Sequence, residues 1–291
     1  MGGRVMNKGQ SQDPIVCTPK SLPRGQWVAA ARAATTINPL NHPPVERLTR
    51  TLTGFVPAPE HIAVLTTKYW HTKGVRLTVG FLDNPPSPFR TKILAHMNAW
   101  AKTANVTFVQ TKGTAQVRIA RAPDGYWSYL GTDILSIDRQ KQTMNLEAFT
   151  MQTPESEFRR VVRHETGHTL GCPHEHMRRE LVALIDQQKA IDYFGSTQGW
   201  SAEEVRQQVL TPIEESSLWG TDHADPNSIM CYQIPGSLTK NGAPIVGGTD
   251  IDGSDYAFLA KVYPKLGKVT VGSKAAALPR KRSNVRGRRR P

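Results

Sequence analysis

Apolar residues alternate or recur at helical spacing through much of the chain, and strand-like segments precede helix-like ones. Alternation at Val75, Leu77, Val79 and Phe81 predicts a half-buried strand. Further strands are expected over residues 106–108, 117–119, 126–137 and 144–149. Spacing near 3.6 residues predicts helices over 89–100, 181–194, 201–210 and 252–263. Strands followed by helices indicate an α+β architecture.

A further predicted helix carries the most informative residues of the chain. Thr153-Pro154-Glu155 supplies an N-cap, a proline at the first helical position and an early acid. The helix is expected to run on to His164 and His168. Residues four apart lie on one helical face, a turn apart, so both imidazoles can bind one metal ion.

The run from His164 to His174 supplies three imidazoles, a carboxylate and a glycine. Gly171 can end the helix with positive φ, which lets His174 return as a third ligand. Three protein ligands with a fourth position left open are typical of a catalytic Zn²⁺, one per chain. Glu165 follows the first ligand, where it can take a proton from a water that the metal activates.

The extended pattern His-Glu-x-x-His-x-x-Gly-x-x-His is similar to the signature of the metzincin peptidases. Ser228-Ile229-Met230-Cys231-Tyr232 resembles their Met-turn. Within that clan the chain most resembles the astacin family, because Glu175 and Arg178 match its His-Glu-x-x-Arg continuation and Tyr232 matches its tyrosine. Tyr69-Trp70 and Gly74 resemble the start of its catalytic domain.

The resemblance implies a zinc endopeptidase that acts on protein or peptide substrates. It implies a metzincin-type fold, in which a twisted mixed sheet and two long helices lie above an irregular C-terminal subdomain, with zinc in the cleft between. Tyr232 would stabilise the oxyanion, and Glu175 could anchor a freed N-terminus. The family's acids after the arginine are replaced by Arg179-Glu180-Leu181, and Cys231 stands where histidine is common. These departures concern the specificity pocket.

Composition divides the chain into three parts. Residues 1–65 are rich in Pro, Gly, Asn and Thr, which indicates an irregular leader or pro-segment, with a short helix possible over 45–52. Residues 66–266 form the expected catalytic domain. Residues 267–291 hold nine of the 37 basic residues and no acid, and are expected to be a disordered tail. The remainder carries 28 basic and 24 acidic residues, so the tail supplies most of the net charge of +13.

Three cysteines do not make a disulfide framework. Cys172 and Cys231 lie in the two motifs around the metal, either as a pair or as two reduced thiols. Cys17 lies in the leader, where its soft sulfur is a candidate cap for the metal of a latent enzyme. The astacin family usually uses an aspartate for this purpose, and the leader shows no clear match to its latency motif.

Functions other than a peptidase find less support in the sequence. A non-catalytic zinc-binding or peptide-binding protein has no need of a base such as Glu165 beside an open metal. The basic tail favours nucleic acid only weakly, because no aromatic interleaving or recognised motif accompanies it. No apolar run can span a membrane, and a monomer is expected. Secretion is implied by the resemblance, but no signal peptide is visible, so cytoplasmic action, an injected effector or another export route stays open.

Overall fold

The computed structural model describes residues 17, 20–43, 66–212 and 224–265. Within them a mixed sheet contains β1 (Val75–Phe81), β2 (Val106–Gln110), β3 (Val117–Ala120), β4 (Tyr126–Ser128) and β5 (Met144–Leu146). The strand order is β2-β1-β3-β5-β4, with β4 antiparallel to β5 and the other pairs parallel. The predicted mixed sheet of an α+β fold is therefore confirmed, and β4 forms one of its edges.

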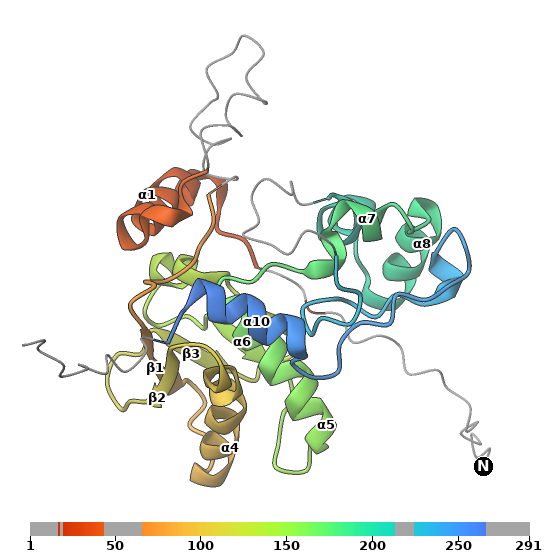
Figure 1. Ribbon diagram of the computed structural model, residues 1–291. Helices are drawn as coiled ribbons and strands as arrows, with labels where there is room; N and C mark the ends of the chain where they lie inside the picture. The colour runs from red at the N-terminus through yellow and green to blue at the C-terminus, as the bar shows by residue number, and fades with distance from the viewer. Residues whose placement is uncertain (1–16, 18–19, 44–65, 213–223, 266–291) are drawn as a thin grey trace, which may run out of the picture.

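Helices surround the sheet and continue beyond it (Figure 1). The α-helices are α1 (Trp27–Ile37), α4 (Ser87–Met97), α5 (Glu155–Glu157), α6 (Arg163–Thr169), α7 (Arg179–Val182), α8 (Gln187–Gln198), α9 (Ala202–Val205) and α10 (Gly253–Val262). Short 3-10 segments are η1 (Arg24–Gln26), η2 (Pro39–Asn41), η3 (Asn98–Lys102), η4 (Gly131–Ser136), η6 (Glu175–Met177) and η9 (Gly236–Leu238). The π-helical turns η5 (Phe158–Val162) and η7 (Arg206–Leu210) continue α5 and α9. None of these helices is long and apolar enough to cross a bilayer.

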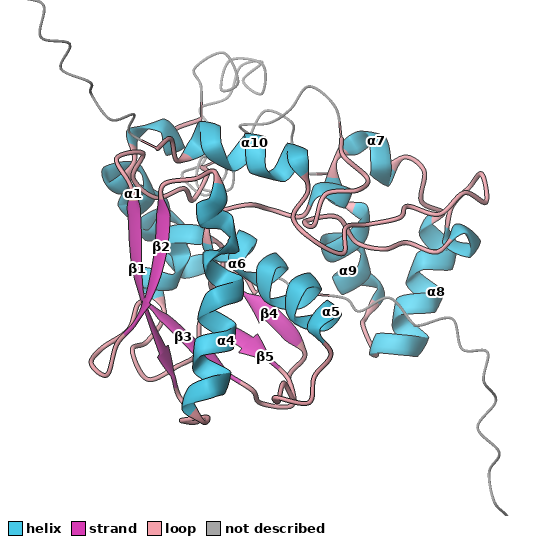
Figure 2. Ribbon diagram, turned by 60° about the horizontal axis from the view of Figure 1, so that its bottom comes forward, coloured by secondary structure: helices cyan, strands magenta, loops and turns pink. Residues whose placement is uncertain are grey.

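A first hydrophobic cluster joins the sheet to α4, to α10 and to η5, the turn that leads into α6. Figure 2 shows α4 lying across the sheet. Phe89 on α4 meets Phe158 edge to face, with ring centroids 6.1 Å apart. The Trp100 indole donates to the Arg163 carbonyl over 2.9 Å. Burial of aromatic rings of this size contributes strongly to stability, so α6 is fixed on a rigid base.

A second cluster, built from α7, α8, α9 and the loops around them, lies on the other side of α6 (Figure 1). Its fully buried side chains include Ile185, Phe194 and Val209. Ser201 and Glu204 form the predicted capping box at the start of α9. Among the described residues, Cys17 is the leader's one member of either cluster, so the cores consist almost wholly of residues 66–265.

Three predicted elements are shorter than the sequence indicated. The strand expected over 144–149 ends at Leu146. The strand expected over 126–137 ends at Ser128, because Gly131 adopts φ +47° against the Lys68 carbonyl and the chain turns into η4. The helix expected over 181–194 is divided into α7 and α8. Between them Ile185 bridges to Thr239 as isolated β-structure, and the Asp186 side chain caps α8.

The leader is not irregular throughout, which corrects part of the prediction. Its alanine-rich segment forms α1, an 11-residue helix. Two asparagines that follow it bind the start of the catalytic region: Asn38 donates to the Trp70 carbonyl over 2.7 Å, and Asn41 exchanges hydrogen bonds with the backbone of Tyr69. The helix expected over 45–52 and the tail beyond residue 265 lie outside the described residues.

Candidate metal centre and active site

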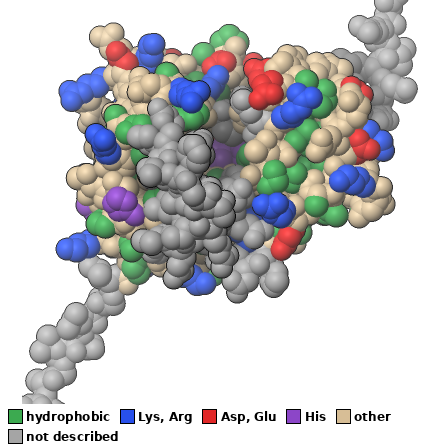
Figure 3. Space-filling model, turned by 90° about the horizontal axis from the view of Figure 1, so that it is seen from above, with side chains coloured by type: hydrophobic (Ala, Val, Ile, Leu, Met, Phe, Trp, Pro, Cys, Tyr) green, Lys and Arg blue, Asp and Glu red, His purple; other side chains and the backbone are tan. Residues whose placement is uncertain are grey.

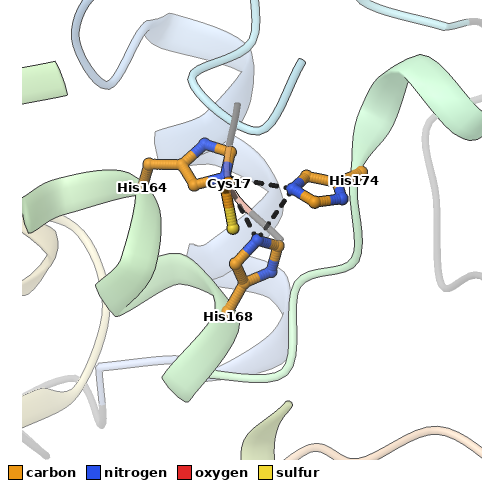
Figure 4. A group of neighbouring side chains, drawn as sticks. All are labelled: Cys17, His164, His168 and His174. Atoms are coloured by element: carbon orange, nitrogen blue, oxygen red, sulfur yellow. Dashed lines mark hydrogen bonds between the residues drawn. The ribbon is translucent and has the colours of Figure 1, made fainter. Parts of the chain in front are cut away.

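The end of α6 brings three histidines to one point. His164 and His168 project from one face of this helix, as their spacing predicts. Gly171 then adopts φ +96°, and a side chain there would meet the Tyr69 ring at 2.8 Å. The chain therefore reverses at the predicted glycine and returns His174 to the other two imidazoles (Figure 4).

The three Nε2 atoms face one another at 3.0–3.1 Å. Nδ1 of His164 donates to the Ile229 carbonyl over 2.6 Å, and Nδ1 of His168 donates to the Cys172 carbonyl over 2.8 Å. Because each neutral ring carries one proton, Nε2 of His164 and Nε2 of His168 hold bare lone pairs. Burial lowers the pKa of His164 to about 4, so these rings stay neutral in ordinary buffers.

Converging lone pairs repel one another unless a cation lies between them. Zinc bound tetrahedrally at 2.0–2.1 Å places its nitrogen ligands about 3.3 Å apart, close to the separations observed here. The backbone carbonyls behind His164 and His168 fix each ring in the orientation that metal ligation requires. The donor set therefore fits a Zn²⁺ ion.

Glu165 lies one residue beyond the first histidine and is buried, with 1% of its surface exposed. Its Oε2 accepts a hydrogen bond from the Cys17 thiol over 3.4 Å, whereas Oε1 has no protein partner among the described residues. A cavity of about 20 Å³ adjoins it, which is room for one water molecule. Burial raises the pKa of this carboxyl to about 8. The hydrogen bond from Cys17 and the positive charge of Arg160 lower it, but by less.

The Met-turn lies directly beneath the three converging histidines. Met230 is buried against α6, and a side chain added at Gly167 would meet its sulfur at 2.4 Å. Asp255 on α10 holds the turn, accepting from the Ser228 hydroxyl over 2.6 Å and from the Ile229 amide over 2.9 Å. Neither Gly167 nor Asp255 was predicted from the sequence, although an uncommon glycine inside a helix was a signal for close packing.

Tyr232 lies beside the third histidine, with ring centroids of Tyr232 and His174 4.3 Å apart. Its other neighbour is His176, whose ring stacks on it at 4.0 Å with an interplanar angle of 16°. His176 is buried, and its Nε2 donates to the Gln208 carbonyl over 3.1 Å. His176 is therefore a packing partner of Tyr232, and it is not one of the described side chains grouped closely enough to hold a metal ion together.

Cys17 of the leader completes a four-residue group with the histidines (Figure 4). Its sulfur and one ring nitrogen of each histidine all lie within 4.8 Å of one another. The Cys17 carbonyl also accepts a hydrogen bond from the Tyr232 hydroxyl. One leader residue thus contacts the histidine site, Glu165 and Tyr232 together. Residues 16 and 18 on either side of it are outside the described chain.

The remaining motif residues support the loop after His174. Glu175 forms an ion pair with Arg178 over 3.3 Å, and the Asp225 amide donates to it over 3.2 Å. Burial raises the pKa of Glu175 to about 7. Cys172 and Cys231 are buried free thiols in the structure.

The fold, the histidine site and the Met-turn together define a zinc metallopeptidase. Residues 64–208 match the peptidase family described as Astacin. Two solved structures of myroilysin are 32% identical to the chain and each covers 68% of it. The matches span 97% and 86% of those chains, with TM-scores of 0.64 and 0.53.

A curated relative is the zinc metalloproteinase nas-27 of Caenorhabditis elegans, 23% identical over 192 residues. This match covers 65% of the chain but only 40% of the relative, so the chain spans well under half of that protein's length. The chain belongs to the astacin family of zinc-dependent peptidases.

Proposed function

We propose that the chain is an endopeptidase that hydrolyses internal peptide bonds of protein substrates with Glu165 as general base. The observation that supports it best is the convergence of three buried imidazole nitrogens beside a buried carboxylate. A non-catalytic zinc protein would have no use for an acid held at this position with an oxygen free of protein partners among the described residues.

The chain's own residues divide the reaction among them. His164, His168 and His174 would hold the zinc, which lowers the pKa of water and polarises a carbonyl as a Lewis acid. Glu165 would remove the proton of the attacking water and deliver it to the leaving amine. The Tyr232 hydroxyl would donate to the oxygen on which charge develops.

The leader would keep the enzyme latent until it is removed. Cys17 places its sulfur at the histidine site, its thiol on Glu165 and its carbonyl on Tyr232, so each catalytic group is engaged. Thiolate is a strong ligand for zinc, so the Cys17 sulfur would compete with water for an ion held by the three histidines. Cleavage within residues 44–65, between α1 and Thr66, would separate this leader from a catalytic region of residues 66–266. The Cys17 cap, a minor idea from sequence, is thus supported by geometry.

The test compares the full chain with chain cleaved within residues 44–65, using an unstructured protein as substrate. We expect the cleaved form to hydrolyse it, a zinc chelator to abolish hydrolysis, and added Zn²⁺ to restore it. The full chain should be far less active, and Cys17→Ala should raise its activity without cleavage. Zinc binding with no hydrolysis in any form would favour the non-catalytic alternative.

A further inference from the structure

The leader also contacts the catalytic region at Lys20, three residues beyond Cys17. Nζ of Lys20 lies 3.4 Å from Oδ2 of Asp124 and 5.1 Å from the ring centroid of Trp127. The three residues line one cavity of about 360 Å³ at the edge of the sheet. This contact lies apart from the histidines, Glu165 and Tyr232, so it has no part in the chemistry described above.

The position of Lys20 follows from how the leader lies on the sheet. Cys17 pairs with Tyr126, and Lys20 pairs with Tyr129, both in the parallel sense. These partners lie in and just after β4, an edge strand whose other side is occupied by β5. An edge strand that loses its partner offers unpaired backbone groups to another extended chain. A peptide that reaches the histidine site can therefore replace the leader along this edge.

The side chains that would bind a cation in this cavity are held in place by contacts with one another. The Trp127 indole donates to Oδ2 of Asp124 over 2.9 Å, which joins the aromatic ring to the carboxylate. Trp127 is 3% exposed and packs edge to face on Tyr129, with centroids 5.7 Å apart. Besides Lys20, the charged lining residues are Asp124, Asp138 and Lys141. When Lys20 is removed, two acidic residues and one basic residue remain in the lining, so the cavity around Trp127 carries a net negative charge.

We infer that Asp124 and Trp127 form a substrate subsite that selects a lysine or arginine side chain, which Lys20 occupies in the leader-bound chain. The inference rests on the proposed peptidase function. Antiparallel strand pairing is slightly more stable than parallel pairing. A substrate that pairs antiparallel to β4 runs from Tyr129 toward Tyr126, opposite to the leader. The selected basic residue then lies on the N-terminal side of the scissile bond, about three residues from the residue at the metal.

Peptide hydrolysis by the leader-cleaved protein tests this subsite. Two peptides identical except for Lys or Gln at that position should differ about five- to tenfold in kcat/KM, as expected for one exposed ion pair and one cation–π contact. Asp124→Asn should reduce this ratio to about twofold or less, mainly by lowering kcat/KM for the Lys peptide. Asp192→Asn, an equivalent change on the distant helix α8, should leave the ratio intact.

Three results would overturn the subsite: equal rates for the two peptides, a preference that Asp124→Asn leaves unchanged, or a basic preference on the C-terminal side of the bond. If no peptide is cleaved, the proposed function fails. The subsite can then be tested by a separate measurement of peptide binding. A fluorescent peptide of residues 14–26 should then bind the leader-free protein about five- to tenfold more tightly than the same peptide with Lys20→Gln. Equal affinities would refute the subsite whether or not the protein is a peptidase.

Discussion

The two hydrophobic clusters differ in how they are built, and the active site lies where they meet. The first cluster is formed by the sheet with α4, η5 and α10, whereas the second is formed by short helices and loops. The boundary divides the Met-turn, since Ile229 and Met230 belong to the first cluster and Cys231 and Tyr232 to the second. Seen from above, Lys and Arg side chains are spread over both sides of the face, and histidine is visible near its middle (Figure 3).

The two clusters support different residues of the candidate site. His164, His168 and Glu165 come from α6, whose orientation is set by the regular core. Tyr232 and its partner His176 depend on the loop-rich half. Metal binding should therefore be most sensitive to the first cluster and transition-state stabilisation to the second.

The largest effect is expected for His168→Ala. This change removes a ligand on the rigid side, so zinc content should fall to a small fraction of one per chain and hydrolysis by at least about a thousandfold. Metal analysis beside a peptidase assay measures both quantities. His176→Phe, which keeps an aromatic ring against Tyr232, serves as the control and should retain its zinc. Full zinc retention in His168→Ala would remove the proposed site.

Gly167→Ala tests the contact between α6 and the Met-turn. The added methyl group would lie 2.4 Å from the Met230 sulfur, so the buried Met230 side chain or the helix must shift. We expect a loss of about 1–3 kcal/mol in unfolding free energy, measured by denaturant titration. Gly195→Ala on α8 has only an ordinary contact at 3.5 Å and should not destabilise. Equal behaviour of the two variants would show that the junction tolerates displacement.

The Tyr232→Phe change should affect turnover more than zinc binding. Its hydroxyl is proposed to act mainly in the transition state, so kcat of the leader-cleaved protein should fall about ten- to a hundredfold with KM nearly constant. Steady-state kinetics and metal analysis on one sample separate the two effects. An unchanged kcat would limit Tyr232 to packing against His174 and His176.

Asp255 gives a smaller, pH-dependent effect at the same junction. Burial raises its pKa to about 6 in the folded chain, above the ordinary value of 3.8. The folded state therefore binds more protons than the unfolded state between about pH 4 and 6, and stability contributed by this group decreases as pH rises through that window. Asp255→Asn should flatten this part of the pH profile by about 1–3 kcal/mol. An identical pH profile of unfolding in the variant would contradict the shift.

The first cluster could largely be read from the sequence, and the second only in part, such as the capping box of α9. Val75 to Phe81 alternates cleanly, and the zinc helix has its N-terminal signals, so periodicity sufficed there. The strand predicted from residue 126 was too long, because the contact of Gly131 with Lys68 that ends it is non-local. The loop-rich half depends on pairings such as Ile185 with Thr239, which no local pattern encodes.

The same limit applies to the site. The three histidines, Glu165 and Tyr232 could be proposed because a short motif fixes their spacing, and the structure brings these side chains together. Asp255 was missed because it reaches the Met-turn from a distant helix, and Lys20 because its partners lie about a hundred residues away. Long-range contacts of single side chains leave no periodic trace in the sequence.

The most direct test of the proposed mechanism is Glu165→Gln in the leader-cleaved protein, with zinc content and peptide hydrolysis measured on one sample. Glutamine keeps the shape of the side chain but cannot accept the proton of the attacking water. We predict close to one zinc per chain, as in the unmodified protein, together with a loss of hydrolysis of at least about a hundredfold. Hydrolysis near the unmodified rate with zinc retained would contradict the assignment of Glu165 as the base.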